Sequence, residues 1–194
     1  MEIVGLLTTV TRDFHRVSMH GVREELLEAQ ARSLGLPLVK VSIPYPCPNE
    51  TYEAAMSAAL RRAREEGVTR IVFGDLFLED CRKYRETKLE GSGFEGVWPL
   101  WLQNTRDLSR RMVQAGLKAT VACLDPQRLS RSFAGREYDG RLLQDLPAEV
   151  DPCAENGEFH TFAWDGPMFS EPVPFRVGET VERDGFVFTD LLPA

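Results

Sequence analysis

The chain has 194 residues, of which 43% are hydrophobic and 27% are charged, as in ordinary globular proteins that bury a sizeable core. Its 30 acidic and 23 basic residues give a formal net charge of -7, which argues against non-specific binding to nucleic acid or to an anionic membrane surface. There is no apolar run of membrane-spanning length and no basic signal-peptide region at the N-terminus. The four cysteines form neither a zinc signature nor a dense disulfide framework, so we expect a reduced, cytoplasmic protein.

Apolar runs alternate with amphipathic segments along the first 124 residues. Short β-branched or alternating runs predict strands, and apolar residues at helical spacing predict helices. The predicted strands are 2–10, 38–43, 70–74 and 118–124, and the predicted helices are 22–34, 51–66, 79–90 and 104–115. Because strands that alternate with helices favour right-handed crossovers, we expect an α/β fold with an open parallel sheet and flanking helices.

The composition changes toward the C-terminus. From residue 148 onward the chain is rich in Pro, Gly and Phe and has no long helical period. Residues 177–183 and 186–190 flank Asp184-Gly185, which is a hairpin turn signal. The sequence therefore predicts a main α/β domain over 1–147 and a small β-rich segment over 148–194 that covers the main sheet.

Gly74 and Asp75 stand at the carboxyl end of the predicted strand 70–74. In open α/β sheets, ligands bind outside the carboxyl ends of the strands, so these two residues are candidates for binding a nucleotide or a metal ion. Glycine lets the backbone approach a ligand, and aspartate can hold Mg²⁺ or a hydroxyl group. The alternative interpretation is a turn that only ends the strand.

A second candidate site is the polar run from residue 155 to residue 161. Its candidate catalytic residues are Glu155, Asn156, Glu158, His160 and Thr161. If residues 158–162 are extended, Glu158, His160 and Phe162 share one face, because strand side chains alternate. A carboxylate beside an imidazole suits proton transfer or the orientation of an amine nucleophile. The alternative is a polar turn that leads into a strand.

Four segments of the chain carry a recognisable pattern: Gly5–Val10 with Arg16–Arg23, Val72–Asp80, Gly96–Trp101, and Glu155–Thr161 followed by Asp165–Phe169. Taken together, they make the chain resemble the diphthine–ammonia ligase family, and more closely its bacterial relatives, in the adenine nucleotide α-hydrolase superfamily. They follow the family's order across nearly the whole chain. The resemblance implies a Rossmann-like fold of the adenine nucleotide α-hydrolase type, in which the C-terminal segment completes the active site.

The resemblance also implies ATP-dependent amide formation, with ATP and Mg²⁺ as cofactors. A carboxylate would be adenylated and ammonia would then displace AMP. Gly74 and Asp75 would lie near the nucleotide, while Glu155, Asn156, Glu158, His160 and Thr161 would face the acyl-adenylate or ammonia. We infer that Glu158 binds ammonium and that His160 takes its proton. The expected partners are a nucleotide, a carboxylate substrate and ammonia, with no nucleic acid and no membrane; a homo-oligomer is left open.

The sequence departs from the family pattern at two places. Family members begin with a strand and a Ser-Gly-Gly-Lys-Asp-Ser loop that cradles the pyrophosphate of ATP, and no such loop occurs here. Residues 2–10 look like the family's second strand, so we expect an N-terminally truncated form in which a strand between 2–10 and 70–74 is missing. Either those two strands pair directly, or unpaired edges remain. At Ala154, relatives usually have glycine.

Two other functions stay open at this stage. The first is a non-catalytic nucleotide- or metabolite-binding module, which the missing phosphate loop favours. The second is a metal-dependent hydrolase that uses Asp75, Glu79 and Asp80, although Glu79 and Asp80 also match the salt-bridged solvent face of a helix.

Overall fold

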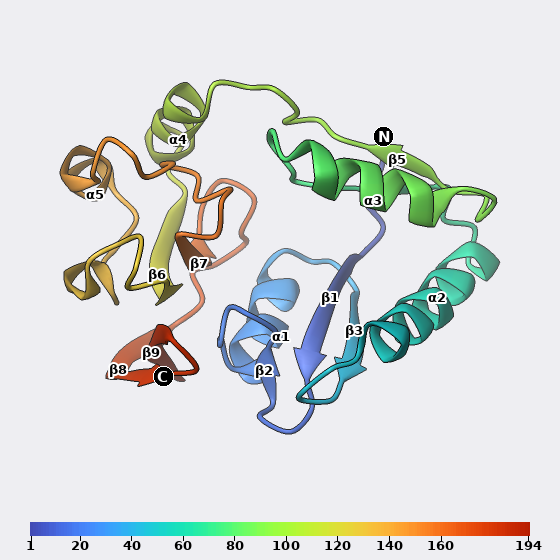
Figure 1. Ribbon diagram of the computed structural model, residues 1–194, viewed down its shortest axis with the longest axis horizontal. Helices are drawn as coiled ribbons and strands as arrows, with labels where there is room; N and C mark the ends of the chain where they lie inside the picture. The colour runs from blue at the N-terminus through green and yellow to red at the C-terminus, as the bar shows by residue number, and fades with distance from the viewer.

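The computed structural model describes residues 1–194 and contains three separate sheets (Figure 1). The strands are β1 (Leu6–Thr11), β2 (Arg16–Val17), β3 (Leu38–Ile43), β4 (Arg70–Val72), β5 (Glu95–Val97), β6 (Lys118–Leu124), β7 (Phe159–Asp165), β8 (Phe175–Arg183) and β9 (Phe186–Pro193). The helices are α1 (Glu24–Ser33), α2 (Asn49–Glu65), α3 (Glu79–Leu89), α4 (Thr105–Gln114) and α5 (Gly140–Asp145), with a 3-10 turn over Arg131–Phe133. No helix is both long and apolar enough to cross a membrane.

The N-terminal strands form two parallel pairs that do not join. β1 runs parallel to β3 from the Leu6–Leu38 pair to the Thr11–Ile43 pair, and β4 runs parallel to β5 in a different sheet. The sequence left open whether the strands now seen as β1 and β4 pair directly or leave unpaired edges. They do not pair with each other, so the second alternative holds. The expected α/β class is confirmed as a mixed fold with several sheets, whereas a single open parallel sheet of Rossmann-like order stays a prediction.

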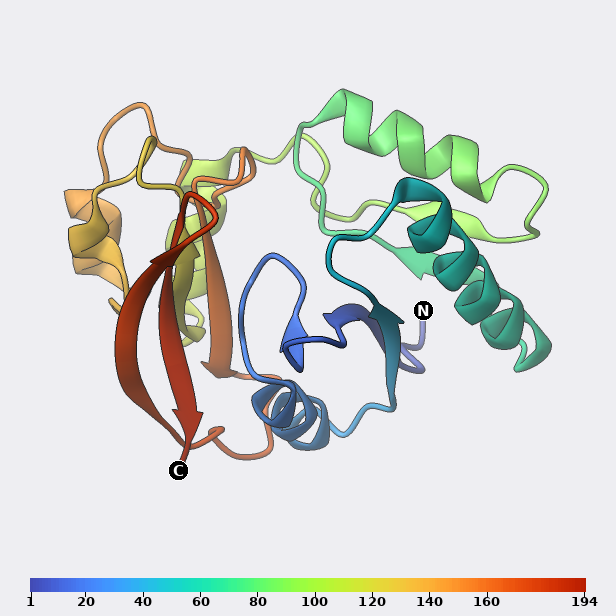
Figure 2. The same cartoon turned by 60° about the horizontal axis from the view of Figure 1, so that its bottom comes forward.

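The C-terminal sheet has four antiparallel strands in the order β7-β6-β9-β8 (Figure 2). The expected hairpin is confirmed: Asp184 and Gly185 both have positive φ, the conformation that a tight turn between β8 and β9 requires. The expectation that β6 extends the parallel sheet is wrong, because β6 pairs antiparallel with β7 and β9. This sheet joins residues on both sides of the boundary expected after residue 147, and that boundary stays a prediction.

The hydrophobic core lies mainly around the C-terminal sheet. β6 is at its centre, with Val121 and Leu124 fully buried. Helix α1 lies between the four-stranded sheet and the β1–β3 pair (Figure 1 and Figure 2), and its Leu26 packs in one cluster with Phe162 and Leu191 of that sheet. In contrast, the 17-residue helix α2 contains no buried residue. The segment from α2 to β5 is therefore held by much less apolar packing than the sheet.

An ionic link joins the N-terminal part to the C-terminal sheet. The Asp190 carboxylate on β9 accepts hydrogen bonds from the guanidinium groups of Arg23 (2.7 and 2.9 Å) and Arg16 (2.9 Å). The hydrogen bond to Arg23 is the main reason why the pKa of Asp190 is lowered to about 2. The link fixes β2 and the start of α1 against β9.

A stack of aromatic rings and guanidinium groups fixes α3 on the β4–β5 sheet. The Arg82 guanidinium lies 4.8 Å from the ring centre of Trp98 and 4.7 Å from that of Trp101. Trp98 stacks on Phe73 at 5.1 Å, and Arg85 covers Phe73 at 4.8 Å. Because Phe73 directly precedes Gly74, this stack determines where the end of β4 lies.

Candidate functional site

The end of β4 and the 155–161 cluster are in direct contact. Glu155 Oε1 accepts a hydrogen bond from the backbone N–H of Leu76 at 2.8 Å and a longer one from Phe77 at 3.5 Å. Leu76 is buried and directly follows Gly74 and Asp75. Two segments that are far apart in the sequence, and that the sequence analysis singled out separately, therefore meet in the fold.

Asp75 already has a partner within the chain. Its side chain is only 9% exposed, and its carboxylate lies 3.0 Å from Arg85 Nε. One carboxylate oxygen, Oδ2, is buried without a hydrogen bond. The hypothesis of a metal centre at Asp75, Glu79 and Asp80 is wrong for this structure, because no group of three or more His, Cys, Asp or Glu side chains is arranged to hold a metal ion. Glu79 and Asp80 are exposed in the first turn of α3, where acidic residues interact favourably with the helix dipole.

The loop from 151 to 158 is held by its own polar groups. The backbone N–H of Asp151 donates to Glu158 Oε1 at 3.1 Å, and the Asp151 carboxylate accepts from the backbone N–H of Glu155 at 2.9 Å. The turn also needs left-handed backbone at Ala154 (φ 57°) and Gly157 (φ 81°). Glycine adopts this conformation without strain, whereas alanine does not. Ala154 thus stands at a position where glycine is favoured.

Glu158 is a buried carboxylate without a cationic partner. The residue is only 3% exposed. Oε1 accepts hydrogen bonds from Asp151 N and from Asn156 Nδ2 (3.0 Å), while Oε2 is buried and has no partner. A buried, partly satisfied carboxylate is costly, so such a group is expected to bind a donor or a cation.

Glu158 directly precedes β7, which begins at Phe159, so its sharing of a strand face with His160 and Phe162 stays a prediction. The ring of His160 packs against that of His20, which precedes α1, with ring centres 4.5 Å apart and the ring planes tilted by 37°. Burial, and secondarily the neighbouring His20, lowers the pKa of His160 to about 4. Burial likewise lowers the pKa of His20, although a hydrogen bond to the Thr161 backbone opposes this effect. Both imidazoles are therefore neutral near pH 7.

His20, His160 and Thr161 line a cavity of about 220 Å³ along β7, which is the edge strand of its sheet. The other lining residues are Met112, Leu117, Ala119, Tyr138, Cys153, Ala154, Phe159 and Ala163. The structure thus brings His160 and Thr161 to this cavity and Glu155 to the end of β4. Asn156 is exposed, and its side chain holds Glu158.

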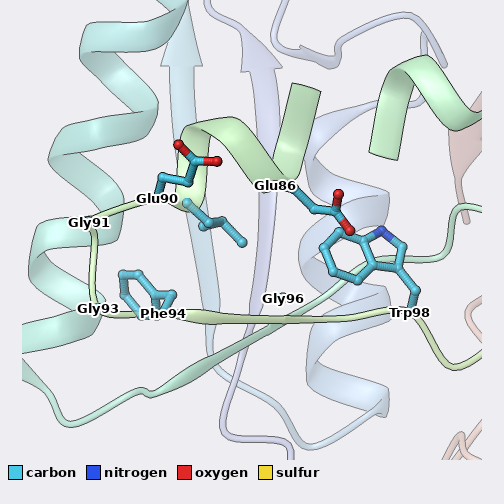
Figure 3. A pocket seen from close by; sticks show the side chains of 8 residues that line it. Glu86, Glu90, Gly91, Gly93, Phe94, Gly96 and Trp98 are labelled. Atoms are coloured by element: carbon cyan, nitrogen blue, oxygen red, sulfur yellow. The ribbon is translucent and has the colours of Figure 1, made fainter. Parts of the chain in front are cut away.

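A larger groove of about 530 Å³ lies between α3 and β5, and its lining includes Glu86, Glu90, Phe94 and Trp98 (Figure 3). Glu86 is paired with Arg82 through a hydrogen bond of 2.8 Å. Gly96 and Trp98 of the segment that carries the resemblance line this groove, but none of the predicted catalytic or nucleotide-binding residues does, so it is separate from the candidate site.

Sequence reasoning missed His20 and Asp151. His20 lies in the segment Arg16–Arg23 that carries the family resemblance, but nothing in the residues around it singles it out as a site residue. Asp151 has no motif around it, and its contacts with Glu155 and Glu158 follow from the turn geometry alone.

Comparison with known proteins gives similarity in the same part of the chain. Residues 104–186 match the family described as "Diphthamide synthase C-terminal domain". The diphthine–ammonia ligase of Schizosaccharomyces pombe is 28% identical over 108 residues, which cover 52% of this chain. The match covers only 18% of that relative's length. These two findings support a relationship to the diphthine–ammonia ligase family. The family match runs from the N-cap of α4 to the start of β9.

Proposed function

We propose that this chain belongs to an ATP-dependent amide-forming ligase of the diphthine–ammonia ligase type. In the proposed reaction a carboxylate attacks the α-phosphate of ATP, pyrophosphate leaves, and ammonia then attacks the acyl carbon of the acyl-adenylate. The C–O bond to AMP breaks, an amide bond forms, and the nitrogen loses one proton. The observation that carries the proposal is the Glu155–Leu76 hydrogen bond, which joins the end of β4 to the 155–161 cluster.

Glu158 and His160 have complementary parts in this proposal. The unpaired Oε2 of Glu158 would accept a hydrogen bond from ammonia or pair with ammonium, which would satisfy the buried carboxylate. Asn156 and the Asp151 N–H hold the other oxygen and so orient the group. His160 is neutral near pH 7 and would accept the proton that the attacking nitrogen releases.

The residues at the end of β4 leave room for a nucleotide but do not suit a metal ion. No atom lies within 4 Å of the position that a Cβ on Gly74 would occupy, so the backbone there is open to a ligand such as the nucleoside part of ATP. Mg²⁺ does not fit at Asp75, because that carboxylate faces Arg85 and is largely buried. No step of the proposal is therefore derived through a metal ion at Asp75.

The test is AMP release by a form of the protein that carries the phosphate loop expected from the resemblance, with ATP, ammonium chloride and a panel of carboxylic acids. We expect AMP formation that depends on both the acid and ammonium. Glu158→Gln should lower amide formation at least 10-fold while ATP affinity, measured by calorimetry, changes less than 3-fold. Glu149→Gln is the matched control, because Glu149 is exposed and makes no side-chain hydrogen bond or ion pair. Equal amide formation by Glu158→Gln and the unmodified protein would contradict the assignment of Glu158.

A non-catalytic nucleotide- or metabolite-binding module is the second candidate function. The pairing of Asp75 with Arg85 favours it, because a carboxylate held in this way is not available for the cofactor. In the same experiment, nucleotide binding without AMP release under any combination of acids and ammonium would support this module and overturn the ligase.

A further inference from the structure

Some polar groups that line the cavity along β7 already have hydrogen-bond partners within the chain, and others do not. The Tyr138 hydroxyl donates to the carbonyl of Pro152 at 2.7 Å, and the Cys153 thiol lies 3.4 Å from the carbonyl of Thr105. Burial raises the pKa of Cys153 to about 12, so its thiol is neutral. The Thr161 hydroxyl makes no hydrogen bond, and the neutral imidazoles of His20 and His160 pack against each other, with one nitrogen of His20 already hydrogen-bonded to the Thr161 backbone. The groups left for a ligand are therefore the imidazole of His160, the second ring nitrogen of His20 and the Thr161 hydroxyl.

No charged residue lines this cavity, since its 11 lining residues include no Lys, Arg, Asp or Glu. Eight of the 11 are hydrophobic. A ligand that carries a charge in addition to its carboxylate would lose the hydration of that charge on entering the cavity. No charged side chain would replace the lost water, which is strongly unfavourable. The lining selects for uncharged, mainly apolar groups.

The size of the cavity sets a second limit. An apolar cavity of about 150 Å³ is enough to bind benzene, so about 220 Å³ has room for one ring with a small substituent. His20 and His160 are only half-buried, so a ligand can approach the cavity from solvent. Ala154 lines the cavity and adjoins Glu155, so a ring inside can keep its substituent beside the candidate cluster.

We propose that this cavity holds the body of the carboxylate substrate, and that the substrate is a single-ring monocarboxylic acid with no second charge. The assignment as a substrate pocket rests on the proposed function, whereas the selectivity for such molecules follows from the lining alone. The His20–His160 pair and the Thr161 hydroxyl hydrogen-bond to the substituent on the ring, and Met112, Phe159 and Ala163 contact the ring itself.

The test is a titration of protein with ¹³C-labelled methionine methyl groups, because Met112 lines the cavity and Met56 of α2 does not. The probes are benzamide, benzoate and isophthalate, and Met112→Leu assigns the resonance. We expect saturable shifts of the Met112 signal with benzamide and benzoate, affinity at least 10-fold weaker for isophthalate, and no shift of Met56. Absence of a Met112 shift with benzamide and benzoate, or equal affinity for isophthalate, would overturn the proposal.

Variants that fill the cavity provide the second part of the test. Ala163→Leu should weaken benzamide binding at least 10-fold, and the smaller step Ala163→Val should weaken it less, which keeps the test usable if the larger variant does not fold. Ala54→Leu is the control, because Ala54 is exposed on α2. Unchanged binding in Ala163→Val and Ala163→Leu would show that the probe binds elsewhere and would overturn the proposal.

The two proposals can fail separately. Benzamide binding at Met112 in a protein that releases no AMP with any acid would keep the cavity as a binding site and remove the ligase function. AMP release with charged acids and no response at Met112 would keep the ligase function and overturn the cavity as its substrate pocket.

Discussion

Glu155 accepts a hydrogen bond from the backbone N–H of Leu76 at 2.8 Å, and this contact joins the loop before β7 to the loop after β4. Both segments also have other supports: Arg85 holds Asp75, and Asp151 holds the backbone of Glu155. The Glu155 carboxylate is thus the connection between two loops that are each held separately. A substitution at Glu155 should therefore change how the two loops lie relative to each other more than it changes the conformation of either loop.

Replacing Glu155 tests this connection. Glu155→Ala should lower the free energy of unfolding by about 1–2 kcal/mol, because the buried N–H of Leu76 loses its acceptor. Glu155→Gln keeps a carbonyl acceptor of the same length and should cost about half as much or less. Urea denaturation measures both, with Glu149→Ala as an exposed control expected within about 0.5 kcal/mol of the unmodified protein. Equal losses for Ala and Gln at 155 would mean that the hydrogen bond does not carry the effect.

Ala154 offers a stabilising substitution. Its φ of 57° costs an alanine about 1 kcal/mol that glycine does not pay, while its methyl group packs only at the edge of a core cluster. Ala154→Gly should therefore raise the free energy of unfolding by about 0.5–1 kcal/mol. Ala115→Gly at the end of α4 is the matched control: φ is -72° there, so glycine should lower stability by a similar amount. If glycine changed the free energy of unfolding in the same direction at both positions, the backbone conformation would not be the cause.

The packing of His20 against His160 predicts a pH dependence of stability. The pKa of His160 is lowered from 6.5 to about 4, so the unfolded chain binds a proton at a higher pH than the folded chain does. The stability that the neutral imidazole provides is thus complete above about pH 6.5 and is lost as the pH falls toward 4, by an amount on the order of 3 kcal/mol. His20, whose pKa is lowered as well, adds a loss of the same sign.

Urea midpoints between pH 7.5 and pH 3 measure this dependence. His160→Gln should flatten the slope between pH 6.5 and pH 4. Asp190→Asn should leave that slope in place, because the Asp190 pKa is lowered from 3.8 to about 2 and its contribution is lost only as the pH falls through that lower range. If the urea midpoint still depended on pH above pH 4 in His160→Gln but no longer did so in Asp190→Asn, the pH dependence would belong to Asp190 and not to His160.

Local patterns in the sequence predicted local structure well. The alternation of apolar residues before Pro44 fixed β3 at residues 38–43, and Asp184-Gly185 predicted the β8–β9 hairpin because few other residue pairs adopt two successive positive φ angles. In the candidate site, the same kind of reasoning found the 155–161 cluster, since polar groups concentrated in seven residues are visible without a structure.

Pairing between distant segments was not visible in the sequence. Residues 118–124 are apolar almost throughout and are buried on both faces, so the pattern does not distinguish a parallel from an antiparallel strand. β5 contains only Glu95, Gly96 and Val97 and lacks alternation altogether. The packing of His20 against His160 likewise depends on how α1 packs on the C-terminal sheet, which no local pattern encodes.

The last prediction concerns the uneven packing of the chain. Both core clusters include the C-terminal sheet, one with α1 and the other with the 3-10 turn and α5, whereas α2 has no buried residue and β4 and β5 form an isolated pair. Local unfolding is easiest where few apolar contacts are lost. The amides of α2 should therefore exchange with solvent at least about 100-fold faster than those of β6 after correction for intrinsic rates.

Helix α1 is the internal control for this experiment. It is shorter than α2, with 10 residues against 17, but it buries Leu26, Leu27 and Ala31. If length and helix propensity governed protection, α2 would exchange more slowly than α1; if burial governs it, α1 should be protected nearly as well as β6. Hydrogen exchange followed by mass spectrometry or NMR distinguishes the two outcomes. Protection of α2 equal to that of α1 would mean that α2 is covered in solution by a contact that the chain alone does not provide, and the unpaired edge of β4 would be the first place to look for it.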